Sequence, residues 1–176
     1  NAKKHLDNNF FVLYGDILTN FNIQKGYQKF IKLKSDFHLI IRHTNHPEDS
    51  DIVVLSSKQR VTNIAKGSDY DFPYMPLGNT ALFYAKKNKI DIKNQKFPSD
   101  IFKDFLKLNL NNYKITGSIS SEYIHDIGTL ERYRKEIPSF RQKIKKPQKV
   151  ALVDRDGTLI EDQGNENNPR KLKFKK

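Results

Sequence analysis

The chain has 176 residues, no cysteine and a formal net charge of +12. Without Cys it has neither disulfides nor thiolate zinc sites. No apolar run approaches the roughly 20 residues needed to cross a bilayer, and residues 1–9 lack the apolar core of a signal peptide. We therefore expect a cytoplasmic protein with no membrane partner.

The positive charge is spread along the whole chain rather than gathered in one place. Only residues 141–149 and 170–176 are densely basic, and neither segment interleaves aromatic residues as a stacking platform for bases would. The pattern is typical of a solvated surface, so we expect no nucleic-acid partner. A positive surface of this kind also tolerates small anionic substrates such as nucleotides and sugar phosphates.

The first part of the chain alternates strands with a helix. Residues 10–14 (FFVLY) form an apolar run that predicts a buried strand ending at Gly15-Asp16. Asn22 is a suitable cap for a helix over residues 22–34, with Ile23, Tyr27, Phe30 and Ile31 on one face. Further apolar runs predict strands over 37–42 and 52–55. Strand, helix and strand in this order are the unit of a parallel sheet.

The remaining elements before residue 137 are shorter. Alternation over 61–64 predicts an edge strand, and Ser99 is a suitable cap for a helix that ends near Leu108. The other expected elements are a strand over 79–84, short strands over 113–116 and 122–124 around a turn at Gly117, and a helix over 130–136 capped by Thr129.

A polar, basic segment bounded by prolines predicts a domain boundary. Residues 138–148 have the composition of a linker, and residues 150–153 (VALV) begin a new apolar strand. We expect a partial domain over 1–137, the linker over 138–148, and the start of a second α/β domain over 149–176.

Asp154-Arg155-Asp156-Gly157-Thr158 follows directly after that strand and carries the sharpest motif of the chain. A motif directly after a strand lies at the carboxyl edge of the expected sheet, where open α/β sheets bind ligands. The segment VALVDRDGTLIEDQG resembles the haloacid dehalogenase-type phosphatases, in their heptose-bisphosphate and histidinol-phosphate branch. The resemblance implies that Asp154 attacks phosphorus and that Asp156 acts as general acid and base, with both holding Mg²⁺ and Thr158 binding the phosphate.

Two further aspartates, Asp16 and Asp126, carry a second resemblance. FVLYGDIL near the start and IHDIGTLERY near the end of residues 10–136 resemble the sugar-1-phosphate nucleotidyltransferases. The resemblance implies an α/β fold with a Rossmann-like, mixed but mainly parallel sheet flanked by helices. It also implies that Asp16 and Asp126 converge on Mg²⁺, which offsets the charge of two anions brought together for reaction.

Two substrate-binding positions match that family only in part. Lys66 lies at the place of a Lys that contacts the sugar phosphate in a Glu-Lys-Pro motif, but its neighbours here are Ala65 and Gly67. Asn79 matches an Asn near the sugar, although Ala81 stands where the family usually has Gly. The family's Gly-rich nucleotide loop is absent, because the match begins after it.

Together the two resemblances imply sugar-nucleotide biosynthesis for cell-surface polysaccharide. A phosphatase would remove one phosphate from a heptose bisphosphate, and a transferase would couple the remaining sugar 1-phosphate to a nucleotide from a nucleoside triphosphate. We expect the chain to be truncated at both ends and inactive by itself. The alternatives are a heptose-bisphosphate or histidinol-phosphate phosphatase with a non-catalytic nucleotidyltransferase-like module, and a module that senses sugar phosphates.

His43, His46, Asp49 and Asp51 form a cluster that could be imagined as a zinc or iron site. We expect instead a loop with hydrogen-bonded histidines, because the segment resembles a loop of the same nucleotidyltransferases. His125, next to Asp126, is expected to pack at the end of a strand.

Overall fold

The computed structural model describes residues 2–44, 46–69, 76–90 and 100–145. Contacts divide the chain into two compact units, Asn1–Phe140 and Arg141–Lys176, and the described residues belong to the first unit apart from the end of its last helix. None of the helices within these ranges is long and apolar enough to cross a membrane.

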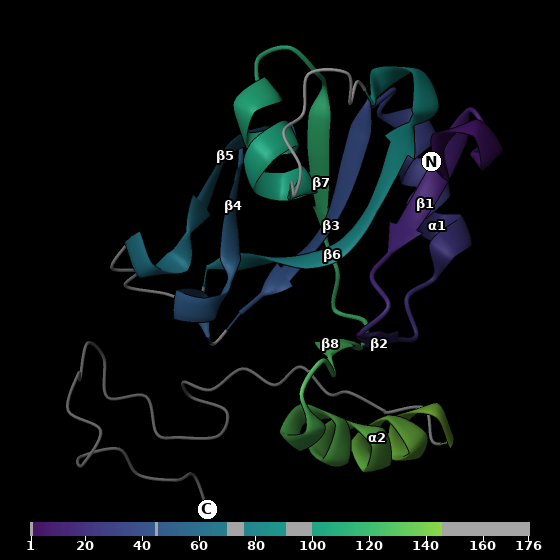
Figure 1. Ribbon diagram of the computed structural model, residues 1–176, viewed down its shortest axis with the longest axis vertical. Helices are drawn as coiled ribbons and strands as arrows, with labels where there is room; N and C mark the ends of the chain where they lie inside the picture. Colours follow the sequence, from purple (N-terminus) through teal and green to yellow (C-terminus); the bar gives the residue numbers. More distant parts are fainter. Residues whose placement is uncertain (1, 45, 70–75, 91–99, 146–176) are drawn as a thin grey trace, which may run out of the picture. The chain divides into compact units, whose positions relative to one another are not determined.

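Eight strands form a six-stranded sheet and a separate two-stranded pair (Figure 1). The strands are β1 (Asn9–Leu13), β2 (Ile17–Thr19), β3 (Phe37–His43), β4 (Asp51–Leu55), β5 (Val61–Lys66), β6 (Leu77–Lys86), β7 (Ile115–Ile119) and β8 (Ile124–Asp126). The α-helices are α1 (Ile23–Lys32) and α2 (Leu130–Lys145). One π-helical turn, η5 (Ile101–Leu106), accompanies the 3-10 turns η1 (Ala2–His5), η2 (Pro47–Asp49), η3 (Gly67–Asp69), η4 (Lys87–Lys89) and η6 (Lys107–Asn109).

The main sheet is mixed and mostly antiparallel, so the expectation of a mainly parallel sheet is wrong. Its order is β5-β4-β6-β3-β7, with β1 also paired to β6, and only β3 and β7 run parallel. The expected β1–α1–β3 unit exists, and its two strands run in the same direction. Long strand β6 lies between them and pairs antiparallel with both, which removes the parallel pairing.

Both faces of the sheet are covered, which explains why Phe37–Ile41 of β3 are all buried, with His38 the one polar residue among them. Phe37, Leu39 and Ile41 pack on one face with Phe102 and other residues of η5. Ile40 points to the opposite face, where Leu82, Tyr84 and Phe30 of α1 form a second apolar cluster. A strand buried on both faces has no polar alternation.

Helix α1 has the predicted cap, but its apolar face is only partly covered. The Asn22 side chain accepts from Lys25 N at 2.9 Å. Phe30 is buried, whereas Ile23 and Ile31 are about half exposed. Gly26, rather than either isoleucine, makes the closest approach to the sheet, because a Cβ there would lie 2.5 Å from Tyr84 Oη.

Three further expectations about local structure need correction, and one strand was not predicted. Asp100 caps η5 by accepting from Phe102 N and Lys103 N, and the predicted cap Ser99 lies outside the described residues. Gly117 lies inside β7 instead of at a turn, and there its missing Cβ makes room for Leu55 and Ile41. Strand β2 was not predicted. Helix α2 continues through Pro138 to Lys145 and so includes part of the expected linker.

Candidate functional site

The small β2–β8 pair brings Asp16 and Asp126 together. The two strands are antiparallel, with Ile17 opposite Asp126, and Ile127 N donates to the Asp16 carbonyl oxygen at 2.8 Å. Two residues distant in sequence therefore become neighbours through backbone pairing. The resemblance implied that these two aspartates converge on Mg²⁺; they lie near each other here, and their role in holding the ion stays a prediction.

Gly128 separates the two carboxylates. A Cβ built on this glycine would lie 2.9 Å from Asp16 Oδ2 and 3.1 Å from Asp126 Oδ1. The two oxygens are therefore no farther apart than the sum of these distances. A side chain at residue 128 would occupy the space that a shared cation needs.

The two carboxylates differ in what they contact. Asp126 Oδ1 accepts from Gly128 N at 2.6 Å, and Asp126 Oδ2 accepts from Arg132 Nη1 at 2.7 Å. Within the described residues no hydrogen bond or ion pair holds the Asp16 carboxylate. Mg²⁺ is commonly held by one or two carboxylates, with substrate phosphates and waters completing the shell. By their chemistry the two carboxylates could hold such an ion through Asp16 Oδ2 and Asp126 Oδ1, the oxygens on either side of Gly128.

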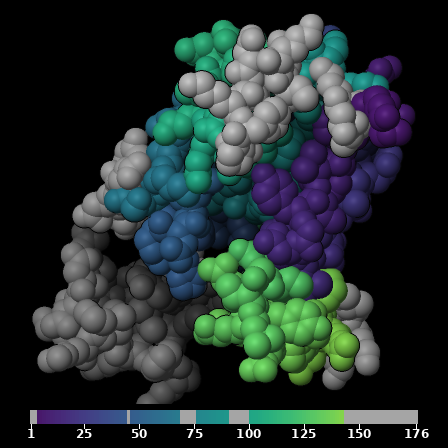
Figure 2. Space-filling view, viewed as in Figure 1, coloured from purple at the N-terminus to yellow at the C-terminus, as the bar shows by residue number. Residues whose placement is uncertain are grey.

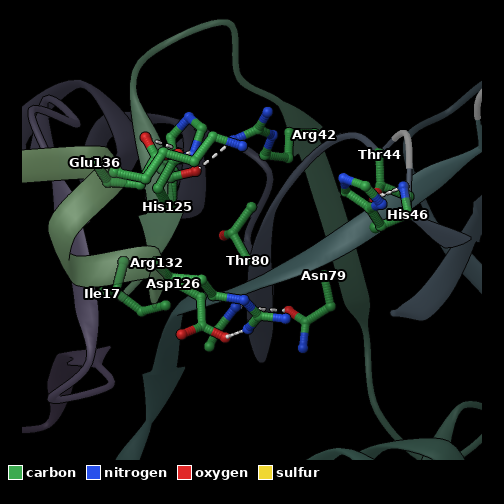
Figure 3. Close-up of a pocket in the computed structure, with 14 residues that line it drawn as sticks. Ile17, Arg42, Thr44, His46, Asn79, Thr80, His125, Asp126, Arg132 and Glu136 are labelled. Atoms are coloured by element: carbon green, nitrogen blue, oxygen red, sulfur yellow. Dashed lines mark hydrogen bonds and ion pairs between the residues drawn. The ribbon is translucent and has the colours of Figure 1, made fainter. Parts of the chain in front are cut away.

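A pocket of about 430 Å³ is lined by Asp126 and by Ile17, the residue after Asp16. Segments far apart in sequence, purple, blue and green in Figure 2, meet on this face of the molecule. Figure 3 shows Asp126, Arg132 and Asn79 at one side of the pocket and His125, Glu136 and Arg42 at the other. The lining comprises Ile17, Arg42, Thr44, His46, Gly78, Asn79, Thr80, Ala81, Ile124, His125, Asp126, Arg132, Lys135 and Glu136.

Two arginines and a lysine line this pocket, and the sequence alone singled out none of them. Arg42 comes from the end of β3, while Arg132 and Lys135 come from the first turns of α2. Arg42 donates Nη1 to the Ile124 carbonyl and Nε to the His43 carbonyl at 3.3 Å, which ties β3 to β8. The three cations outnumber the two lining carboxylates, and this balance favours an anionic ligand.

His125 has a packing role, as expected, and is also part of the pocket wall. Its ring stacks on Tyr123 with 4.2 Å between centroids, and its Nδ1 lies 3.2 Å from Glu136 Oε2. Tyr123 Oη donates to the same carboxylate oxygen. Burial, and secondarily Glu136, raises the pKa of Tyr123, so its hydroxyl stays protonated and anchors α2 to the residue that precedes β8.

Asn79 lines the pocket at an irregular point of β6. The β3–β6 register shifts between Ile40 and Ile41, and Asn79 Oδ1 accepts from Ala81 N at 3.1 Å. Ala81 has a φ of 59°, a left-handed conformation that glycine adopts without strain. The backbone thus has the geometry that suits the family's Gly, although Ala occupies the position.

Lys66 does not line this pocket. It lies at the end of β5, and its Nζ is 2.9 Å from Asp51 Oδ1. The next residue, Gly67, shows why the family's Pro does not fit here. A Cβ at residue 67 would lie 1.5 Å from the Pro47 carbonyl oxygen, and Gly67 N donates to the Ser50 carbonyl at 3.0 Å. A proline would meet that oxygen and lose that hydrogen bond.

The described residues of the segment around His46 are not arranged as a metal site. His46 Nδ1 lies 3.6 Å from Glu48 Oε1, and Asp51 pairs with Lys66. The described part of the chain has no group of three or more His, Cys, Asp or Glu side chains placed to hold a metal ion. The predicted phosphatase residues Asp154, Asp156 and Thr158 lie outside the described residues.

The sequence did contain signals for the three missed cations. Arg132 follows the helix cap Thr129 by three residues, which places its side chain in the first turn beside Asp126. Lys135 lies one turn farther on the same face. Arg42 ends a buried strand, where a charged side chain emerges at the edge of the sheet.

Comparison with solved structures identifies the fold. HddC from Yersinia pseudotuberculosis matches 79% of this chain with a TM-score of 0.61 and 22% identity. A putative glucose-1-phosphate thymidylyltransferase from Bacillus anthracis, solved with sucrose, matches 88% with a TM-score of 0.62 and 14% identity. HddC complexed with GMP-PN matches 79% with a TM-score of 0.52 and 20% identity.

The chain has a nucleotidyltransferase-like α/β fold. It spans 59% of the length of each HddC chain and 61% of the thymidylyltransferase chain. No family model and no curated protein sequence matches it.

Proposed function

We propose that residues 9–136 form the sugar-phosphate side of a nucleotidyltransferase active site that works in sugar-nucleotide biosynthesis. The observation that carries the proposal is the convergence of Asp16 and Asp126 on either side of Gly128, at the edge of a pocket with excess positive charge. The nucleotidyltransferase-like fold supports it, as does the GMP-PN bound by HddC.

The reaction joins two anions. An oxygen of a sugar 1-phosphate attacks the α-phosphorus of a nucleoside triphosphate; one P–O bond forms and the bond to pyrophosphate breaks. A bound Mg²⁺ would neutralise charge on the phosphates. Asp16 and Asp126 would hold that ion, and Arg42, Arg132 and Lys135 would hold the sugar phosphate in place for attack.

Of the two predicted substrate-binding residues, only Asn79 lines the pocket. Asn79 lines the pocket and offers an amide side chain to a sugar hydroxyl. Lys66, the predicted phosphate contact, is paired with Asp51 and stands outside the lining. We therefore assign phosphate binding to the arginines and Lys135 before Lys66.

The direct test is Mg²⁺-dependent binding of a sugar 1-phosphate, measured by calorimetry with α-glucose 1-phosphate. We expect Asp16→Asn and Asp126→Asn to abolish the dependence on Mg²⁺. Asp7→Asn removes an equal charge from an exposed residue outside the pocket and should leave binding unchanged. Equal behaviour of all three variants would refute the site.

Transfer activity is tested on the protein expressed from its complete reading frame. Pyrophosphate release from a nucleoside triphosphate plus sugar 1-phosphate, lost in Asp126→Asn, would establish catalysis. Sugar-phosphate binding without pyrophosphate release would instead assign a non-catalytic or sensing module.

A second candidate activity rests on the sequence alone. Residues 150–158 (VALVDRDGT) favour a phosphatase in which Asp154 is the nucleophile, Asp156 the acid and base, and Thr158 a phosphate ligand, acting on a heptose bisphosphate or histidinol phosphate. Phosphate release from these two substrates with Mg²⁺, lost in Asp154→Asn and retained in Asp126→Asn, is the expected result. No release from either substrate would remove the phosphatase assignment.

A further inference from the structure

Arg132 reaches back from the first turn of α2 to Asp126. Its Nη1 lies 2.7 Å from Asp126 Oδ2, and the two side chains are 47% and 46% exposed. The backbone there is held by Thr129, whose Oγ1 accepts from Arg132 N at 3.2 Å and whose carbonyl accepts from Tyr133 N at 2.9 Å. Asp126 therefore holds the guanidinium at the pocket wall, and both side chains are partly exposed to water.

The position of this arginine is unfavourable for the helix itself. A cation in the first turn opposes the helix macrodipole, which favours acidic side chains there. Asp126 offsets the charge of Arg132. Lys135, three residues later, also lines the pocket and has no ion pair among the described contacts. The α2 face toward the cavity thus presents two cations.

The same carboxylate serves two purposes. Asp126 is one of the two aspartates on either side of Gly128, and its Oδ2 is the atom that accepts from Arg132. Its other oxygen accepts from Gly128 N. Oδ1 is also the oxygen that faces Asp16 across Gly128, so a divalent cation between the aspartates would bind Asp126 there while Arg132 holds Oδ2. The guanidinium and the cation would then share one carboxylate and repel each other, which favours the departure of Arg132.

We infer that Arg132 is an anion-binding residue, held by Asp126 through an ion pair and released to a sugar phosphate when a divalent cation takes the carboxylate. The inference rests on the proposed function. A free guanidinium presents paired N–H groups that match two phosphate oxygens. Cation binding and phosphate binding are therefore coupled through one side chain, and the coupling is reciprocal.

The test compares Arg132→Gln with Arg134→Gln. Arg134 is an exposed residue of the same helix outside the pocket lining, so its variant removes the same charge without touching the site. Mn²⁺ binding is followed by the electron paramagnetic resonance signal of the free ion. Binding of α-glucose 1-phosphate is measured by calorimetry with and without Mg²⁺. Arg132→Lys, which keeps the charge without the planar fork, is the second variant.

The expected signs are opposite for the two ligands. Without sugar phosphate, Arg132→Gln should bind Mn²⁺ about two- to fivefold more tightly than the unaltered chain, which is the scale of a lost half-exposed ion pair. The enhancement of α-glucose 1-phosphate binding by Mg²⁺ should disappear in Arg132→Gln and be partly retained in Arg132→Lys. Arg134→Gln should change neither quantity.

Two outcomes would overturn the inference: Mn²⁺ affinity that is unchanged or weaker in Arg132→Gln, or an intact enhancement by Mg²⁺ in that variant. Asp16→Asn separates this failure from that of the proposed function. If Asp16→Asn leaves Mn²⁺ binding unchanged, the metal site itself is wrong. If Asp16→Asn weakens binding while Arg132→Gln behaves like Arg134→Gln, only the release of Arg132 is wrong.

Discussion

Gly26 gives a stability prediction whose sign depends on tertiary structure. In an isolated helix, replacing Gly by Ala stabilises by about 1 kcal/mol. Here an added Cβ would lie 2.5 Å from Tyr84 Oη and 2.6 Å from Phe21 Cζ. Tyr84 is fully buried, and its hydroxyl donates to the Ile23 carbonyl at 2.6 Å. Helix α1 must therefore move away from the sheet, or Tyr84 must lose this hydrogen bond.

The magnitude follows from the two costs. Overpacking costs about 2 kcal/mol, and a buried hydroxyl left without its partner costs about 2 kcal/mol. With about 1 kcal/mol of helix propensity in the other direction, Gly26→Ala should lower the free energy of unfolding by about 1 kcal/mol where one cost applies and by about 3 kcal/mol where both apply. Urea denaturation followed by far-ultraviolet circular dichroism measures this quantity.

A double-mutant cycle identifies the cause. Tyr84→Phe removes the hydroxyl that the new methyl group meets, so Gly26→Ala should cost less in that background. Gln24→Ala, at an exposed position of the same helix, should change the free energy of unfolding by less than about 0.5 kcal/mol. A gain in stability from Gly26→Ala would refute the close packing of α1 against Tyr84.

Three further predictions concern the site and the core. Gly128→Ala should weaken Mn²⁺ binding by about tenfold or more, because its methyl group fills the space between the carboxylates. The free energy of unfolding, measured by urea denaturation, should change by less than about 0.5 kcal/mol, since both neighbours are movable side-chain ends. Undiminished Mn²⁺ affinity would place the ion elsewhere. Ala81→Gly should raise the free energy of unfolding by about 0.5–1 kcal/mol in the same assay, because the left-handed conformation strains Ala more than the added backbone entropy of Gly costs; a loss of stability would contradict the strain. Burial, together with the charge of Lys29, lowers the pKa of His38 from 6.5 to about 4. The unfolded chain therefore takes up a proton before the folded one, so the contribution of His38 is complete above pH 6.5 and falls by about 3 kcal/mol as the pH drops to 4. The change in unfolding free energy between pH 7 and pH 4.5 should be smaller in His38→Gln, and an equal change in both proteins would refute this protonation argument.

Local patterns predicted the elements whose formation depends on nearby residues. The apolar runs of β1, β3 and β4 and the caps Asn22 and Thr129 lie within a residue or two of the predicted places. Strand β2 escaped prediction because it has three residues and gains its partner only by pairing with β8. No periodicity is readable in so short a segment.

The candidate site was likewise predicted only in part. The proximity of Asp16 and Asp126 was expected from the family resemblance rather than from spacing, and the β2–β8 pairing brings them together. The cations of the pocket were missed because Arg42 meets α2 only through the folded chain. In a chain with many Lys and Arg residues, a single basic residue can be assigned to a site only when the folded structure shows that it lines a pocket.

The sequence by itself determined where the longer strands and the start of each α-helix lie, because capping and apolar burial depend on side chains a few residues apart. Strand order was decided only by tertiary structure. The strand–helix–strand pattern cannot show that β6 lies between β1 and β3, since an antiparallel and a parallel neighbour bury the same apolar side chains. The partner of Arg132 was decided there as well, because the geometry of the loop from β8 to α2 places its guanidinium on the carboxylate of Asp126.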